Sequence, residues 1–267
     1  MAGEAEAPAF SIGDALEILH NLGSKQLERL ILVGGQAAAF WIARYDIAEP
    51  YRVTTKDIDV FSSESSAVAV DCAKDLGGEI QAFNKPRSPD VARVLLSLRG
   101  AELQIDFLRS LHGIATSDVI DSKLAVPDER MHGKLLFVMH PALALASRLI
   151  NTFELDGRLT EENLTRLQFS VRALHAYLME ELSAGEEEVR VDVLPSIERV
   201  FKLALSRSGL RAWHEHEIDV FRAAPNTSEL SKSCPKPFLE KRLPQMFREL
   251  ARKRKASKRR RHSRSGH

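Results

Sequence analysis

The sequence predicts an α/β protein in two parts, a domain with a mixed β-sheet followed by a mostly helical domain. In residues 1–140, short apolar runs bounded by glycine or polar residues recur as β-strands do. From residue 141 the apolar residues recur at helical spacing. The 267 residues suit one large domain or two ordinary ones. We therefore predict a helical domain at 141–245 and a basic, disordered tail at 246–267.

The first predicted elements are a helix, a buried strand and a second helix. Ser11 and Asp14 form a capping-box pattern before an amphipathic segment, and Gly23 ends that segment. The apolar run 30–33 predicts a buried strand that ends at a pair of glycines. The Ala-rich segment 36–44 contains no glycine or proline and predicts a helix. The expected order is strand, glycine turn, helix.

The following segments complete the predicted sheet. Residues 57–61 alternate polar and apolar side chains, which predicts a half-buried strand. A helix is expected over 67–76, where two glycines follow it. The apolar runs 91–98 and 101–108 flank a short turn and predict a β-hairpin, and 135–139 predicts a last strand.

The remaining segments predict helices. Residues 142–153, 161–182 and 197–206 carry apolar side chains at helical spacing. Four prolines between 223 and 245 predict an irregular approach to the tail, with short helices.

Charge is divided unevenly along the chain. Of the 38 Lys and Arg, nine lie in 252–267, which holds no acid, so this tail carries +9 and the rest of the chain −8. Such a tail attracts a polyanion strongly at low salt and much less at physiological salt. No aromatic residue is interleaved for base stacking. We consider three interpretations: a nucleic-acid-binding arm, a solvated solubility tail and the accidental end of a reading frame.

Cysteine usage and hydropathy predict the compartment. Cys72 and Cys234 are far apart, which excludes a disulfide scaffold and a cysteine zinc cluster and fits a reducing environment. The first ten residues lack a basic segment followed by an apolar run. No stretch reaches the roughly 18 apolar residues that a spanning helix needs. We therefore expect a cytoplasmic protein with no membrane partner.

Three aspartates are candidate metal ligands. Asp57 and Asp59 lie two apart in a predicted strand, so both carboxylates lie on one face of the sheet. Like charges held this close raise each other's pKa unless a cation lies between them. Asp106 lies among large apolar residues, where a carboxylate is costly to bury unless it is paired or metal-bound. If the two strands are neighbours, the three carboxylates can hold two Mg²⁺ ions about 4 Å apart.

The glycine turn is a candidate phosphate site. Gly34 and Gly35 precede the predicted helix 36–44. Backbone N–H groups at a helix N-terminus bind phosphate, and glycine permits close approach. Gln36 adds a side-chain donor. The turn lacks the third glycine of a dinucleotide-binding motif and the Gly-Lys-Ser/Thr of a P-loop, which disfavours both of those classes.

Three successive segments resemble motifs of the nucleotidyltransferase superfamily related to DNA polymerase beta. They are Leu32–Ala38 with the glycine turn, Arg52–Phe61 with the paired acids, and Gln104–Phe107 with the third acid. The Arg-Val-Thr-Thr-Lys approach to the paired acids most resembles bacterial AbiEii toxin-type nucleotidyltransferase-like proteins. The resemblance covers residues 28–110 well and the helical half only loosely.

This resemblance implies a nucleotidyltransferase palm built on the mixed sheet. In that superfamily the glycine turn binds the triphosphate, and three acids hold two Mg²⁺ ions. The resemblance therefore implies that Gly34 and Gly35 bind the nucleotide. It implies equally that Asp57, Asp59 and Asp106 are the catalytic, metal-binding residues.

Two departures, one from the toxin-type pattern and one from the compact members of the superfamily, concern the nucleotide and its acceptor. Arg148 stands where a lysine facing the nucleotide is more usual, and we include it with Gln36 among the nucleotide-binding candidates. The 21 residues between Gly35 and Asp57 exceed the spacing in compact superfamily members, as they do in the toxin type. Both departures leave the acceptor open and the metal site intact.

The resemblance implies a metal-dependent nucleotidyltransferase that transfers a nucleotidyl group from an NTP to an acceptor. RNA, a protein and a small molecule are all candidate acceptors. The toxin type also implies a toxin–antitoxin role, with an antitoxin as partner. The alternative is a catalytically inactive scaffold that binds nucleic acid or a partner protein. Taken alone, an Asp-x-Asp pair is also common on an exposed edge strand.

Overall fold

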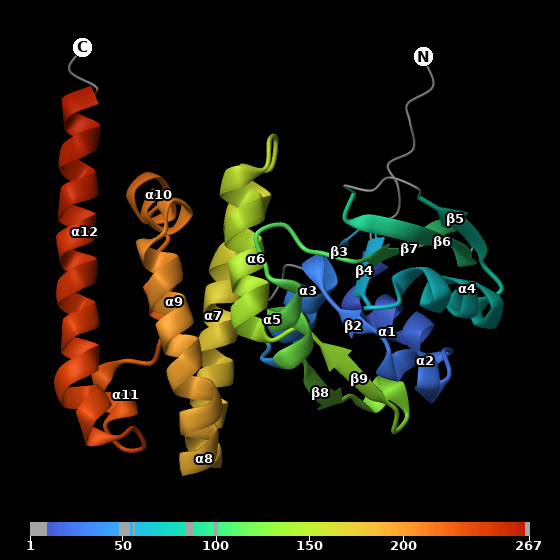
Figure 1. The fold of residues 1–267 in the computed structure, drawn as a ribbon, viewed down its shortest axis with the longest axis horizontal. Coiled ribbons are helices and arrows are strands. Elements are labelled where there is room, and N and C mark those ends of the chain that lie inside the picture. Colours follow the sequence, from blue (N-terminus) through green and yellow to red (C-terminus); the bar gives the residue numbers. More distant parts are fainter. Residues whose placement is uncertain (1–9, 48–53, 56, 84–87, 99–100, 265–267) are drawn as a thin grey trace. The chain divides into compact units, whose positions relative to one another are not determined.

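The chain forms two compact units in the computed structural model, which describes residues 10–47, 54–55, 57–83, 88–98 and 101–264 (Figure 1). The first unit is Met1–Arg148 and the second is Leu149–His267. The division falls within helix α6, Pro141–Glu154, eight residues after the predicted boundary at 140. The boundary differs because buried residues of α6, Leu143 and Leu145 among them, belong to the first unit.

The described strands of the first unit form a seven-stranded mixed sheet with the order β5-β6-β7-β4-β2-β9-β8. Strand β4 is parallel to β7 and antiparallel to β2, and β2 is parallel to β9. The predicted mixed sheet is therefore confirmed. The strands are β2 Ile31–Leu32, β4 Asp57–Phe61, β5 Glu79–Ala82, β6 Asp90–Leu98, β7 Ala101–Leu108, β8 Leu124–Pro127 and β9 Leu135–Val138. A separate pair joins β1 Phe10–Ser11 to β3 Thr54–Thr55.

Three helices of the first unit lie close to the predicted positions: α1 Ile12–His20, α3 Gly34–Arg44 and α4 Ser65–Leu76. The sequence analysis did not predict α2 Ser24–Glu28, α5 Thr116–Asp121 or the 3₁₀ turn at Glu129–Met131. The capping box is confirmed at α1. The Ser11 N–H donates to Asp14 Oδ2 at 2.9 Å, and the Asp14 N–H donates to Ser11 Oγ at 3.3 Å.

Strand β2 is shorter than predicted because Val33 leaves the strand to begin α3. Val33 is the N-cap residue of that helix, and its carbonyl accepts a hydrogen bond from the Ala37 N–H at 3.1 Å. Val33 alone therefore separates the strand from the glycine turn. This places the start of α3 directly at the end of a central strand of the sheet.

The core of the first unit lies on one face of the strands that carry the aspartates. Ile58 and Val60 of β4 are fully buried, as are Ile105 and Phe107 of β7. Because side chains alternate along a strand, these apolar residues point away from the intervening acids. Burying each such side chain contributes about 1.5–3 kcal/mol. The same packing holds β4 and β7 in place and directs their acids to the opposite face.

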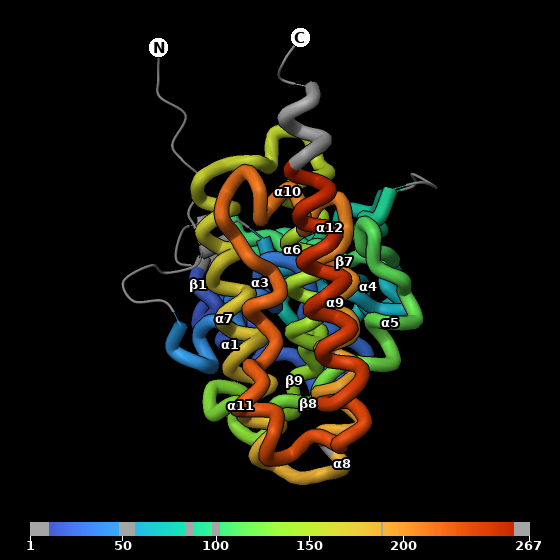
Figure 2. Tube along the Cα trace, turned by 90° about the vertical axis from the view of Figure 1, so that its left-hand side faces the viewer, coloured from blue at the N-terminus to red at the C-terminus, as the bar shows by residue number. Residues whose placement is uncertain are grey.

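The second unit is helical, as predicted. Its helices are α7 Glu161–Ala184, α8 Glu186–Glu188, α9 Leu194–Leu205, α10 Arg207–His216, α11 Thr227–Leu230 and α12 Leu243–Arg264. Shorter helical turns lie at Val189–Val193, Val220–Ala223 and Phe238–Arg242. Helix α9 contacts both α10 and α12 (Figure 2). Over the residues that the structure describes, no helix is both long and apolar enough to span a membrane.

The structure corrects the predicted disordered tail. Residues 246–264 belong to α12, which is helical from Leu243 to Arg264. The helix forms because Leu243, Met246 and Leu250 recur at helical spacing and are buried within the second unit. A high density of positive charge therefore does not prevent order here, since apolar packing of one face stabilises the helix.

Candidate active site

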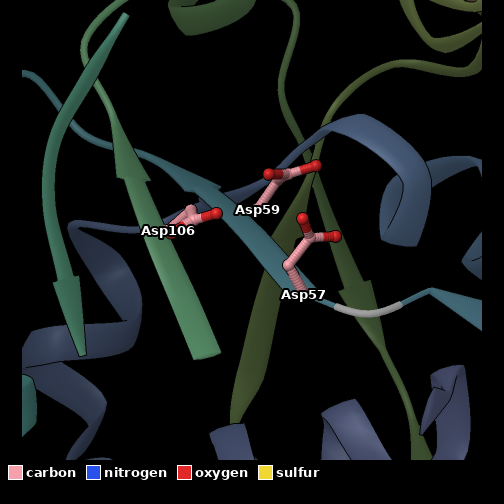
Figure 3. Close-up of side chains that lie close together, drawn as sticks. All are labelled: Asp57, Asp59 and Asp106. Carbon is pink, nitrogen blue, oxygen red and sulfur yellow. The ribbon is translucent and has the colours of Figure 1, made fainter. Parts of the chain in front are cut away.

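Three carboxylates converge on one face of the central sheet. Asp57 and Asp59 lie on β4, and Asp106 lies on the neighbouring strand β7 (Figure 3). The parallel pairing of the two strands places Asp59 opposite Asp106. One oxygen of each carboxylate lies within 4.8 Å of the others. The structure thus brings together the three acids that the sequence singled out.

Crowding and burial make the cluster electrostatically unfavourable by itself. Asp106 is buried, with 6% of its surface exposed, and Asp57 and Asp59 are half-buried. Burial, followed by the charges of Asp57 and Asp106, raises the pKa of Asp59 to about 7, against a hydrogen bond from the Gly35 N–H that lowers it. A cation between these carboxylates would relieve both the repulsion and the loss of hydration.

The glycine turn lies against the same cluster. Gly34 has a φ of +60°, and a Cβ built on it would lie 2.1 Å from Asp59 Oδ2. The Val33 N–H donates to the Asp59 carbonyl at 3.0 Å, which joins the turn to β4. Glycine is therefore required at position 34 both for its backbone conformation and for the close approach to Asp59. The acids and the N-terminus of α3 form one site.

The other predicted nucleotide-binding residues lie on two helices. Gln36 is in the first turn of α3 and is buried, with 1% of its surface exposed. Arg148 is on α6 and is half-buried. Nucleotide binding by these two side chains stays a prediction. Of the motif before the paired acids, Arg52, Val53 and Lys56 lie outside the described residues.

Arg93 belongs to the site and was missed by the sequence analysis. It lies on β6, opposite Asp106 in the hairpin. Its Nε donates to Asp106 Oδ1 at 2.6 Å, and its Nη2 lies 3.3 Å from Oδ2. The hydrogen bond to Asp106 raises the pKa of the Arg93 guanidinium. The register that pairs Leu98 with Ala101 also pairs Arg93 with Asp106, so the register of the predicted hairpin was a signal that could have found it.

The chemistry of the cluster fits a hard divalent cation. Mg²⁺ takes oxygen ligands and is commonly held by one or two carboxylates together with substrate phosphates. The cluster offers three carboxylates with one guanidinium beside them, so its charge remains negative after Arg93 is counted. The raised pKa of Asp59 reflects first its burial and then the charges of Asp57 and Asp106, and a cation would offset both.

Comparisons with known proteins identify similar folds. No family model matches the sequence, and no curated protein matches it. Among solved structures, an antigenic nucleotidyltransferase-like protein from Paracoccidioides brasiliensis is 10% identical with a TM-score of 0.42, covering 79% of this chain and 97% of that one. The Megavirus polyadenylate synthase is 11% identical with a TM-score of 0.41, covering 78% of this chain and 43% of that one. These identities are too low to transfer residue roles, so the AbiEii-type resemblance depends on the sequence motifs alone.

Proposed function

We propose that this protein is a metal-dependent nucleotidyltransferase. The observation that carries the proposal is the convergence of Asp57, Asp59 and Asp106 beside the backbone of Gly34. Carboxylates that surround one point suit a divalent cation, and a glycine turn at a helix N-terminus suits a phosphate. Together the two features suit a nucleoside triphosphate, with its cations at the carboxylates and its phosphates at the glycine turn.

The proposed reaction joins an acceptor oxygen to the α-phosphorus of an NTP. A new P–O bond forms to the acceptor, and the bond from the α-phosphorus to the bridging oxygen of pyrophosphate breaks. Pyrophosphate leaves with that electron pair. The proton of an acceptor hydroxyl passes to a carboxylate oxygen of the cluster and then to solvent. RNA, a protein hydroxyl and a small molecule are the candidate acceptors.

Each part of the site has a proposed role. Asp57, Asp59 and Asp106 would hold two Mg²⁺ ions, which supply charge neutralisation and acceptor activation when bound. Gly34 and Gly35 would bind the triphosphate through backbone N–H groups at the start of α3. The first turn of α3 contains no acidic residue of its own, and the adjacent Asp59 carboxylate, which accepts a hydrogen bond from the Gly35 N–H, would be neutralised by the bound cations.

Label transfer from an α-labelled NTP tests the activity. The protein is incubated with Mg²⁺, each labelled NTP, and either total tRNA or cell lysate as acceptor. We expect transfer by the wild type, its loss in Asp57→Asn, and its retention in Asp75→Asn, which changes an exposed acid on α4. Transfer that persists in Asp57→Asn, or none to any acceptor class, contradicts the proposal.

The second candidate is an inactive nucleotidyltransferase-like scaffold that binds nucleic acid or a partner protein. The observation that favours it is Arg93, which engages the carboxylate of Asp106 and supplies a positive charge without a metal. An inactive scaffold predicts no label transfer and no calorimetric signal when Mg²⁺ and an NTP are titrated into the protein. The enzyme predicts binding of both, with weaker binding in Asp57→Asn.

The toxin role that the sequence motifs imply is a separate proposal about the same chemistry. Toxicity would require the acidic cluster, so induced expression of the wild type should slow growth while Asp59→Ala should not. Co-expression of an antitoxin encoded by the neighbouring gene should restore growth. Equal growth of cells that express the wild type and Asp59→Ala argues against toxicity and leaves the enzymatic proposal to the label-transfer assay.

A further inference from the structure

Helix α12 has one face that packs against its own unit. Leu243, Met246 and Leu250 are buried along this face. Arg254 continues it by one turn, since its guanidinium forms an ion pair with Asp219. The apolar contacts and the ion pair together fix the rotation of the helix about its axis. The side chains on the rest of the helix surface are therefore held in a fixed orientation toward solvent.

Arg254 is a structural cation, unlike its neighbours. Its guanidinium lies 4.6 Å from the centre of the Trp213 ring, and its side chain is 16% exposed. A cation stacked on an aromatic ring and paired with a carboxylate is held in one place. This contact anchors α12 at the point where the basic segment of the sequence begins.

The exposed part of the same turns is strongly basic. Four cations of residues 252–258 are exposed, and we name them the α12 basic face: Arg252, Lys253, Lys255 and Lys258. No acidic residue follows Glu249 in the sequence. Four further arginines follow within the bounds of the helix: Arg259, Arg260, Arg261 and Arg264. The sequence therefore stays rich in positive charge from position 252 to 264.

The α12 basic face matches the charge spacing of a nucleic-acid helix. Residues 252 to 258 span about 9 Å at the rise of an α-helix. A DNA duplex carries one phosphate charge per about 1.7 Å of axis over its two strands, so the same length of duplex carries roughly five phosphate charges. The four cations of the α12 basic face are comparable in number, and arginine and lysine are the side chains that contact phosphates.

The apolar contacts of α12 disfavour a membrane as the partner. A helix that lies in a membrane surface needs a free apolar face, but Leu243, Met246 and Leu250 are buried in the second unit. Phe247 is 43% exposed and packs edge-on against Phe221 at 5.5 Å between ring centres. The α12 basic face has no aromatic side chain on which a single-stranded base would stack.

We propose that the α12 basic face is a docking surface for the phosphodiester backbone of a nucleic-acid helix. The surface belongs to the second unit, whereas the acidic cluster belongs to the first. The proposal does not rest on nucleotidyl transfer, although a docked nucleic acid would supply hydroxyl groups for that reaction. Binding is expected to be insensitive to base sequence, because the contacts are with phosphates.

Salt-dependent binding of the full chain to a labelled 20-base-pair RNA stem-loop, and to a DNA hairpin of the same sequence, tests this proposal. The test variant replaces the four residues of the α12 basic face with alanine, which preserves helix propensity. The matched control replaces four exposed cations outside α12 with alanine: Lys25, Lys74, Arg172 and Lys232. Circular dichroism and thermal melting establish that both variants are folded.

The expected result is a large change in affinity and in its salt dependence. The binding constant K falls as salt rises, so the slope of log K against log salt is negative. If all four cations contact phosphates, their loss makes this slope less negative by about 3 to 4. Affinity at low salt should fall by at least about 100-fold, while the control stays within about threefold of the wild type. Tighter binding of the RNA hairpin than of the DNA hairpin identifies RNA as the nucleic acid that this surface binds. Equal binding of both hairpins supports recognition of phosphates in either nucleic acid.

Three results would overturn the proposal. The first is equal loss of binding in the two variants, and the second is unchanged binding in the α12 variant. The third is tighter binding of heparin, of an acidic peptide or of phosphatidylserine vesicles than of either hairpin. Asp57→Asn, on the other unit, should keep the wild-type affinity for the hairpins. A failure of label transfer with binding intact therefore separates this inference from the proposed activity.

Discussion

Arg93 and Asp106 face each other across the β6–β7 hairpin and form a two-point contact, with Nε to Oδ1 at 2.6 Å and Nη2 to Oδ2 at 3.3 Å. The Arg93 side chain is 30% exposed and the Asp106 side chain 8% exposed, so the pair is partly shielded from solvent. The guanidinium also lies 5.5 Å from the centre of the Phe83 ring. Arg93 therefore balances part of the negative charge of the cluster and holds the orientation of Asp106.

Replacing Arg93 with methionine should destabilise the fold. The change leaves a buried carboxylate without its main counter-charge, and removing one partner of a buried pair typically costs about 3–5 kcal/mol. Because Arg93 is partly exposed, we expect about 2 kcal/mol in the free energy of unfolding measured with urea. Arg93→Lys keeps the charge and should lose less. An equal loss in both variants would mean that charge is unimportant at this position.

The same replacement should strengthen cation binding at the cluster. Arg93 repels a divalent cation near Asp106, so Arg93→Met should raise the affinity for Mn²⁺ by about tenfold in a calorimetric titration. Arg93→Lys should stay near the wild type. Weaker Mn²⁺ binding in Arg93→Met, with the fold intact, would show that the orientation of Asp106 matters more than the charge of Arg93.

Gly34→Ala should be more damaging than an ordinary substitution at a left-handed glycine. Its φ is +60°, and the added Cβ would lie 2.1 Å from Asp59 Oδ2. Gly77 is the matched control, since its φ is +64° and a Cβ there meets no atom within 4 Å. We expect about 1 kcal/mol of destabilisation for Gly77→Ala and about 3 kcal/mol for Gly34→Ala, measured by urea denaturation. Equal losses would contradict the close approach of Gly34 to Asp59.

The raised pKa of Asp59 predicts a pH-dependent stability that a cation removes. The folded state holds this proton up to a pKa of about 7, against an ordinary value of 3.8, so the folded state binds more protons between these values. Stability therefore falls as pH rises from about 4 to about 7, by a few kcal/mol at most. Asp59→Asn should remove this part of the dependence in melting curves recorded in EDTA. A parallel dependence in both proteins would mean that Asp59 does not titrate in this range.

Arg254 should contribute to stability, whereas its neighbour should not. Arg254→Met removes the ion pair with Asp219 and the contact with the Trp213 ring, for an expected loss of about 2 kcal/mol. Lys253→Met changes an exposed cation one residue away and should change the free energy of unfolding by less than about 0.5 kcal/mol. Similar effects in the two variants would argue against an anchored α12.

The local features of the fold could be predicted from the sequence because their causes are local. Alternation along 57–61 places Asp57 and Asp59 on one face and Ile58 on the other. The capping box at Ser11 and the hairpin at 91–108 likewise involve residues close together in the chain. Even the membership of Asp106 in the cluster was foreseeable, although it was conditional on its strand lying beside 57–61.

What only the tertiary structure decided is which distant elements meet. The parallel pairing of β4 with β7 places Asp59 opposite Asp106, although 46 positions separate them in the sequence. The position of Gly34 against Asp59 follows from the pairing of β2 with β4. The tail is a helix rather than a disordered arm because packing within its own unit, including the contact of Arg254 with Asp219, stabilises it. The periodicity of a segment determines which face of a strand or helix a side chain lies on, and it can be read from neighbouring residues. Which strands and helices pack together depends instead on burial and charge summed over the whole fold.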